Sequence, residues 1–240
     1  MPFNPSKLSS MRRVGLIGGS SWASSVDYYK YINQMVNDRL GGKESARLTL
    51  DSMNFGDLVR CNEAEDWDGV NRMLRAAARR LKASEAEGLV ICANTLHLHA
   101  QGVPESVDLP LIHIAHAAAA AIAKQGLTRV ALLGTRWTME QDVYHSILGE
   151  MGIEIMIPES GEREFIHESI FNELGRNVFK PETKARYLRI VGEVLGRGAQ
   201  GVILGCTEIP MLVSPEEIPA PAFDTTRLHA AAAVDFALGS

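Results

Sequence analysis

The order of apolar and polar positions along the chain predicts alternating strands and helices. Short runs that are apolar at nearly every position have the length of buried strands, and longer stretches repeat apolar residues at helical spacing. The predicted strands are residues 13–18, 46–52, 88–93, 109–114, 128–135, 153–158 and 201–206, and the segment P-A-F-D-T (221–225) precedes the last helix. The predicted helices are 22–40, 70–87, 115–125, 141–151 and 183–198, followed by a last helix at the C-terminal end. Continuously apolar strands separated by helices are typical of parallel sheets covered on both faces, so we expect an α/β fold.

The two halves of the chain echo each other. R-V-G-L-I-G-G in the first half parallels R-V-A-L-L-G-T in the second, and E-G-L-V-I-C-A-N-T parallels Q-G-V-I-L-G-C-T-E. We therefore expect two pseudo-symmetric lobes, each a mostly parallel sheet flanked by helices: 11–112 plus 225–240, and 113–224. Residues 1–10 are predicted to be a loose extension. Sheets of this kind bind ligands beyond the carboxyl ends of their strands, so the cleft between the lobes is the expected site.

Composition narrows the class of protein. The chain has 240 residues, enough for a sizeable core, and a net charge of −5, which gives no sign of nucleic-acid binding. No apolar run has the length of a membrane span. The three cysteines are few and odd in number, which favours a reducing, cytoplasmic setting over a disulfide framework. The histidines lack the spacing of a zinc site, so no metal is expected.

Small and polar residues follow several predicted strands. Ser20 and Ser21 stand in a G-G-S-S-W turn that opens a helix, where backbone amides can attract an anion; the turn lacks the G-x-G-x-x-G pattern, so NAD is not expected. Asn94, Thr95 and Thr207 stand at equivalent strand ends in the two halves. Such side chains either cap helices or bind a carboxylate, and the sequence leaves both roles open.

Cys206 is the most informative of the three cysteines. A thiol at a strand end beside a helix N-terminus can have a depressed pKa and act as a nucleophile or base. The commoner role of a free cysteine is structural, and that role is predicted for Cys92, which lies inside an apolar strand. Because neighbouring strand residues face opposite sides, Cys92 should point away from the position of Ala93. Cys61, in a polar stretch, is expected to be incidental.

Several motifs together resemble the aspartate/glutamate racemases, a branch of the cofactor-independent Asp/Glu/hydantoin racemase superfamily. The matching segments are G-L-I-G-G-S-S-W (15–22), A-N-T-L-H (93–97), A-L-L-G-T-R-W-T-M-E-Q (131–141), G-C-T-E-I (205–209) and F-D-T-T-x-x-H (223–229). The resemblance covers nearly the whole chain from Arg12 onward.

The resemblance implies a two-base mechanism without pyridoxal phosphate. One cysteine thiolate removes the Cα proton of an amino acid and a second thiol delivers a proton to the other face. Cys206 corresponds to one of these bases. The residues implied to bind substrate are Ser20, Ser21, Arg47, Asn94, Thr95, Thr135 and Thr207. Those implied to support them are His97, Glu208, Asp224 and His229. The family further implies a small amino acid or dicarboxylate as ligand, no cofactor, and a homodimer.

The chain departs from the family pattern in ways that bear on activity. The first family cysteine stands immediately before Asn-Thr, and here that position is Ala93, which carries no proton. Ala23 replaces a frequent glutamate after the tryptophan, and a substrate-binding lysine is replaced near Phe165. Arg47 still matches a family arginine that can bind a distal carboxylate.

Three functions follow from these residues. The first is an amino-acid racemase of acidic or related substrates that uses Cys206, impaired or one-directional because of Ala93. The second is a decarboxylase of the arylmalonate type, which needs one cysteine because loss of carbon dioxide creates the carbanion. The third is a non-catalytic relative that keeps the carboxylate-binding residues.

Overall fold

Two four-stranded parallel sheets organise the protein, and both have the same strand order. The computed structural model describes residues 11–239. The first sheet has the order β2-β1-β3-β4 and the second the order β6-β5-β7-β8. The strands of the first sheet are β1 (Val14–Gly18), β2 (Leu48–Ser52), β3 (Gly88–Ile91) and β4 (Leu111–Ile112). Those of the second are β5 (Arg129–Gly134), β6 (Glu154–Met156), β7 (Val202–Gly205) and β8 (Ala222–Asp224).

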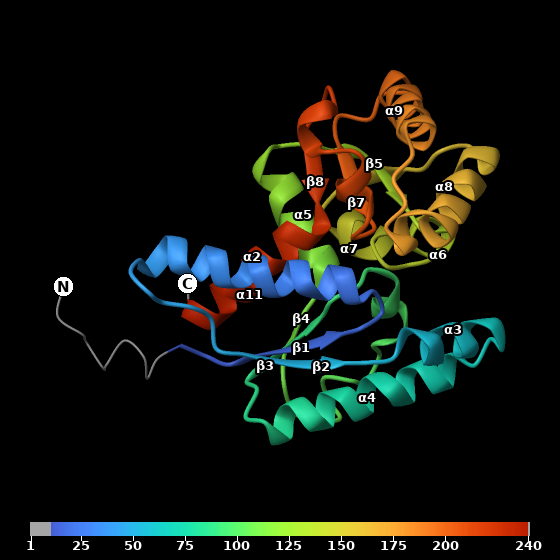
Figure 1. Ribbon diagram of the computed structural model, residues 1–240. Helices are drawn as coiled ribbons and strands as arrows, with labels where there is room; N and C mark the ends of the chain where they lie inside the picture. Colours follow the sequence, from blue (N-terminus) through green and yellow to red (C-terminus); the bar gives the residue numbers. More distant parts are fainter. Residues whose placement is uncertain (1–10, 240) are drawn as a thin grey trace. The chain divides into compact units, whose positions relative to one another are not determined.

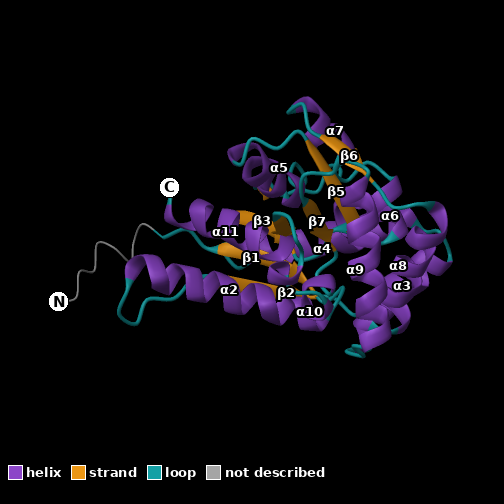
Figure 2. Ribbon diagram, turned by 90° about the horizontal axis from the view of Figure 1, so that it is seen from above, coloured by secondary structure: helices purple, strands orange, loops and turns teal. Residues whose placement is uncertain are grey.

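Helices cover both faces of each sheet (Figures 1 and 2). The α-helices are α2 (Trp22–Leu40), α3 (Phe55–Glu63), α4 (Trp67–Ala83), α5 (Ile114–Lys124), α6 (Arg136–Glu140), α7 (His145–Glu150), α8 (Ser160–Asn172), α9 (Pro181–Gly196), α10 (Ile209–Leu212) and α11 (Thr225–Leu238). Three 3-10 turns are η1 (Thr95–His99), η2 (Leu174–Arg176) and η3 (Pro215–Glu217). In Figure 1, α2 and α11 lie on one face of the first sheet and α4 on the other. In the second sheet, α5 lies on one face and α8 and α9 on the other.

The described chain divides into two compact units. The first consists of residues 11–92, 99–113 and 229–239, and the second of residues 93–98 and 114–228. Each unit has its own apolar core: Leu16 and Val90 are fully buried in the first, and Leu132 and Ile203 in the second. Burial of one such side chain contributes about 1.5–3 kcal/mol, so these strands are held mainly by their apolar faces.

The predicted fold class is confirmed, as is the internal echo between the halves. The repeated R-V-x-L-x-G segment forms β1 and β5. Each is an inner strand at the equivalent position of its sheet: β1 lies between β2 and β3, and β5 lies between β6 and β7. The helix over 22–40 is confirmed, and most other elements are found within a few residues of their predicted bounds. The predicted extension over residues 1–10 lies outside the described residues.

Four of the described helices were not predicted from the pattern. They are α3, α6, α8 and α10, and each offers few buried apolar residues. In α8, for example, the buried positions are Ile166, Ser169 and Ile170, one of which is polar. Such a helix has a weak periodic signal, because its stability comes from tertiary packing rather than from a continuous apolar stripe.

Gly19 makes the turn that follows β1. Its φ is 89°, a conformation that favours glycine, and an added Cβ would stand 2.0 Å from the carbonyl oxygen of Met53. Met53 cannot move away, because its amide donates a hydrogen bond of 2.9 Å to the Gly18 carbonyl. The turn is therefore open only to a residue without a side chain.

Among the described residues, no helix is both long enough and apolar enough to span a bilayer.

We predict that Gly19→Ala lowers the free energy of unfolding by more than about 1 kcal/mol, since the new methyl group meets backbone and the φ is unfavourable for alanine. Gly149→Ala is the matched control, because a Cβ there meets nothing within 4 Å and the residue lies in α7. Urea unfolding of both variants measures the difference. Equal stabilities for the two variants would contradict this account of the turn.

Candidate active site

The carboxyl ends of the strands in the second sheet carry several of the predicted site residues. Thr135 follows β5, Cys206 follows β7, and Thr225 follows β8 as the first residue of α11. Because β7 pairs with both β5 and β8, these three strand ends lie at one edge of the sheet. The segment 93–98 also belongs to this unit.

Three threonine hydroxyls form a cluster in this unit. Thr95 Oγ1 lies 3.0 Å from Thr135 Oγ1 and 3.1 Å from Thr138 Oγ1, and the last two are 3.1 Å apart. Thr135 also caps α6, since its hydroxyl accepts the Thr138 amide hydrogen at 3.2 Å. The cluster fixes the segment around Thr95 to the carboxyl end of β5.

A second network holds the side-chain amide of Asn94. Asn94 Nδ2 donates to Thr225 Oγ1 at 3.2 Å, and Thr225 Oγ1 donates to the Leu204 carbonyl oxygen at 2.8 Å. On its other side, Asn94 Oδ1 accepts a short hydrogen bond from the Tyr144 hydroxyl. Both Asn94 and Tyr144 are buried, so this network is screened little by water.

Cys206 is paired with a buried carboxylate. Its Sγ lies 2.9 Å from Glu208 Oε2, and the same oxygen accepts the Thr207 hydroxyl at 2.7 Å. Cys206 is 7% exposed and Glu208 is 6% exposed. The G-C-T-E segment thus places a thiol, a hydroxyl and a carboxylate side by side at the end of β7.

The predicted depression of the Cys206 pKa is wrong. Burial raises the pKa of this thiol well above its ordinary value, and the negative charge of Glu208 raises it further. The helix that was expected to favour a thiolate is α10, a four-residue segment that begins after Glu208. The resting thiol is therefore protonated at neutral pH, and Glu208 is the adjacent group that can accept its proton.

The charge of Cys206 reaches the Asn94 network. Burial is the main cause of the raised pKa of Tyr144; the Thr225 hydroxyl lowers this pKa, and negative charge on Cys206 raises it. The thiol and the Tyr144 hydroxyl are therefore close enough to interact electrostatically. Tyr187 is also buried, and negative charge on Cys206 likewise raises its pKa.

The other two cysteines lie apart from this chemistry. Cys92 is fully buried in the apolar core of the first unit, and burial raises its pKa, so its predicted structural role is confirmed. Ala93, the next residue, groups with the second unit and is partly exposed. Cys61 lies in α3 and is partly exposed.

Ser20 and Ser21 lie at the carboxyl end of β1 in the first unit. Ser21 is the N-cap of α2, and its hydroxyl accepts the Ser24 amide hydrogen at 3.4 Å. Within the same turn, the Gly19 amide donates to Ser25 Oγ at 2.9 Å. The turn therefore satisfies part of its own hydrogen bonding, and both serines are partly exposed.

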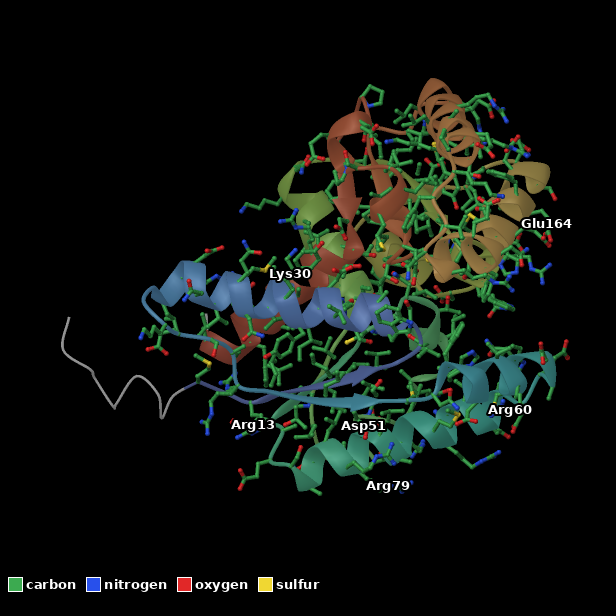
Figure 3. The ribbon with its side chains drawn as sticks, viewed as in Figure 1. Arg13, Lys30, Asp51, Arg60, Arg79 and Glu164 are labelled. Atoms are coloured by element: carbon green, nitrogen blue, oxygen red, sulfur yellow. The ribbon has the colours of Figure 1, made fainter. Side chains whose placement is uncertain are left out.

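Arg47 does not lie with the strand-end residues of its own sheet. It immediately precedes β2, and its carbonyl accepts the amide hydrogen of Val14 at the start of β1. In parallel strands this is the amino edge, which Arg13 marks in Figure 3, whereas Ser20 follows the carboxyl edge. Arg47 and Ser20 therefore lie at opposite edges of the sheet. This position does not support the substrate-binding role that the resemblance implied for Arg47.

His229 is a buried residue of the first unit. Its Nδ1 lies 2.8 Å from the Tyr28 hydroxyl and its Nε2 lies 2.6 Å from the Ile112 carbonyl oxygen. Since a carbonyl can only accept, the proton is on Nε2 and Nδ1 accepts from Tyr28. Burial lowers the pKa of His229 to about 4, so the ring is neutral at physiological pH.

His97 and Asp224 shape backbone in the second unit. His97 Nδ1 donates to the Ala93 carbonyl oxygen at 2.8 Å, and its Nε2 accepts the Ile114 amide hydrogen at 3.4 Å. Asp224 Oδ1 accepts the amide hydrogens of Thr226 and Arg227 at 2.9 and 3.2 Å, which caps the start of α11. Both residues therefore position the segments that carry the site.

The described residues contain no group of three His, Cys, Asp or Glu side chains arranged to hold a metal ion.

Comparison with known proteins decides the family. Residues 17–233 match the family model described as Asp/Glu/Hydantoin racemase. The chain belongs to this racemase family. The chain also matches curated glutamate racemases. It is 24% identical over 149 residues to the one from Lactococcus lactis, and the match spans about half (51%) of that relative's length.

Solved structures of other racemase-family proteins share the fold closely. A candidate Asp/Glu racemase from Yersinia pestis is 41% identical, with a TM-score of 0.89 over 95% of this chain and 100% of that one. An aspartate racemase homologue from Pyrococcus horikoshii is 32% identical, with a TM-score of 0.82 over 95% and 99% of the two chains. Arylmalonate decarboxylase, at 14% identity and a TM-score of 0.54, shares the fold alone.

Two residues of the candidate site were not predicted from the sequence. Tyr144 and Thr138 both follow β5, and they contact Asn94 and Thr95, which lie more than forty positions earlier. Thr138 stands in the matching T-R-W-T-M-E-Q segment, so the motif offered a signal for it. Tyr144 lies beyond that segment inside a predicted helix, and its contact depends on tertiary structure.

We predict that Glu208→Gln lowers the pKa of Cys206, because the amide keeps a hydrogen-bond acceptor but removes the negative charge that opposes a thiolate. The measurement is a pH titration of thiolate absorbance, with Cys206→Ser subtracted. Glu164→Gln is the control, since Glu164 lies on the outer surface of α8 (Figure 3). A Cys206 pKa that stays at the parent value in Glu208→Gln would contradict the assigned cause.

We predict that the free energy of unfolding falls as the pH falls from 6.5 towards 4, because the buried His229 ring resists protonation in the folded protein. The unfolded chain takes up a proton near the ordinary value of 6.5, whereas the folded ring takes it up only at about 4, so the contribution is complete above 6.5 and is lost below it. The full shift corresponds to about 3 kcal/mol. Urea unfolding at several pH values should show a smaller loss in His229→Gln than in the parent or in the exposed control His116→Gln. The same loss in all three proteins would show that His229 is not its source.

Proposed function

We propose that this chain is a pyridoxal-phosphate-independent amino-acid racemase of aspartate, glutamate or a related amino acid, with Cys206 as its acid/base. The observation that carries the proposal is the 2.9 Å contact between Cys206 Sγ and Glu208 Oε2 in a member of a racemase family. Removal of a Cα proton needs a base, and a thiol with an adjacent proton acceptor can become one.

The activation of Cys206 is a proton transfer within the pair. The thiol gives its proton to the Glu208 carboxylate, which leaves a thiolate beside a neutral carboxylic acid. The thiolate then takes the Cα proton of the substrate, and the electron pair of the C–H bond moves into the substrate carboxylate as an enediolate. Return of the proton from Cys206 regenerates the amino acid and the starting thiolate.

Hydrogen-bond donors near Cys206 support the binding of the substrate α-carboxylate and its enediolate. Asn94 Nδ2 uses one hydrogen on Thr225, and its second hydrogen has no acceptor within residues 11–239. Thr95 presents a hydroxyl from the partly exposed side of the threonine cluster. Donors fixed before the substrate arrives stabilise charge that develops during proton removal.

Ala93 defines the expected defect. A racemase must remove a proton from one face of Cα and deliver one to the other, and a methyl group can do neither. We infer that Cys206 exchanges the proton on its own face and that inversion relies on slow proton delivery from water. The enzyme is then an attenuated racemase that exchanges faster than it inverts.

The relatives support acidic substrates without fixing one. The curated relative from Lactococcus lactis is named glutamate racemase, and the Pyrococcus horikoshii protein is described as an aspartate racemase homologue. A homodimer and a small amino acid or dicarboxylate as ligand are part of the same proposal.

We predict that Cys206→Ser reduces deuterium uptake at Cα of aspartate or glutamate by at least about 10²-fold in heavy water, since removal of a general base has effects of this size. Cys61→Ser is the matched control, because Cys61 lies in α3 of the first unit. Proton NMR of an amino-acid panel follows the loss of the Cα signal. Equal uptake with both variants would exclude Cys206 as the base.

We predict that Ala93→Cys increases the racemisation rate by about 10² or more, because it restores a proton carrier at the missing position. Loss of optical rotation from each enantiomer of aspartate and glutamate measures this rate. Ala93→Ser is a control of similar size with a far weaker acid. If neither the parent nor Ala93→Cys racemises any amino acid, yet the parent releases carbon dioxide from a disubstituted malonate, the decarboxylase function replaces this one.

A further inference from the structure

The Asn94 side chain can be oriented by counting protons in its network. A carbonyl oxygen only accepts hydrogen bonds, so the single hydroxyl hydrogen of Thr225 is directed to the Leu204 carbonyl, 2.8 Å away. Thr225 Oγ1 can then only accept from Asn94. The group of Asn94 that faces Thr225 at 3.2 Å must therefore be the Nδ2 donor.

This leaves Oδ1 of Asn94 facing the Tyr144 hydroxyl, which must donate to it. The opposite amide orientation would set Oδ1 against a Thr225 oxygen that has no hydrogen to give. These two oxygens would then be acceptors in contact inside a buried site, an arrangement that costs free energy. The hydrogen bonds thus all run in one direction: Tyr144 donates to Asn94, Asn94 donates to Thr225, and Thr225 donates to the backbone carbonyl of Leu204.

We propose that Tyr144 is a positioning residue that locks the Asn94 amide so that its second Nδ2 hydrogen is available to the substrate carboxylate. This inference rests on the proposed function, because it assigns Asn94 to that carboxylate. Tyr144 itself touches no reacting atom. Its burial keeps the hydroxyl protonated, and hence a donor, at any pH at which the enzyme works.

The chain offers a matched control in Tyr187. Its hydroxyl is equally buried in the same unit and bonds to Ser169 Oγ at 2.9 Å and to the Ile166 carbonyl oxygen at 3.3 Å. Tyr187→Phe therefore removes a buried tyrosine hydroxyl without affecting Asn94. A loss that follows Tyr144→Phe alone separates positioning from general destabilisation.

The test measures Cα deuterium uptake of L-aspartate and L-glutamate as a function of concentration. We expect Tyr144→Phe to raise KM about tenfold, with a smaller change in kcat, and Tyr187→Phe to leave KM unchanged. In an Asn94→Ala background, Tyr144→Phe should have no further effect on KM, because the amide that it positions is gone. The proposal is overturned if Tyr144→Phe keeps the parent KM, or if it raises KM by the same factor with and without Asn94.

A second measurement does not require activity. The side-chain amide protons of Asn94, assigned by comparison with Asn94→Ala, should shift and exchange faster with water in Tyr144→Phe than in the parent or in Tyr187→Phe. If the parent shows no Cα exchange with any amino acid, the racemase proposal fails while this readout still tests Tyr144. Unchanged Asn94 resonances in Tyr144→Phe would disprove the positioning role.

Discussion

The contact between the Cys206 thiol and the Glu208 carboxylate is the interaction on which the proposed chemistry of this protein depends. Burial and the negative carboxylate both disfavour a thiolate, so the pair holds one proton on sulfur at rest. The same carboxylate is also the nearest acceptor for that proton, at 2.9 Å. In the proposed mechanism, the same contact keeps the thiol protonated at rest and supplies the acceptor through which it becomes a base.

The parallel arrangement of the strands brings the residues of this site together. Parallel strands end at a common edge, so residues that follow β5, β7 and β8 meet although they are far apart in the chain. The hydroxyl cluster around Thr135 and the amide network around Asn94 then attach the segment 93–98 to the same unit. Buried hydrogen bonds of this kind make the donors rigid, which is the condition for stabilising charge in a transition state.

Much of the fold could be predicted because it rests on periodic burial. Continuous apolar runs identified the inner strands, and Cys92 is the core residue that its apolar run indicated, although β3 ends one residue before it at Ile91. The surroundings of each side chain could not be predicted from the sequence. The pKa of Cys206 depends on a carboxylate two residues away that could have pointed elsewhere, and Arg47 matched a family position while lying at the amino edge of its sheet. Tyr144 gave no signal, because its one informative contact is with Asn94, fifty positions away.

The central claim is that the chemistry at Cα has one protein base instead of two. It is tested most directly in the parent protein by following, in one sample, both deuterium uptake at Cα and the change of configuration for each enantiomer of aspartate and glutamate. A single base at Cys206 predicts that one enantiomer takes up deuterium with retained configuration much faster than it inverts. Equal rates of uptake and inversion from both enantiomers would contradict the claim, because they would require a second proton carrier besides Cys206.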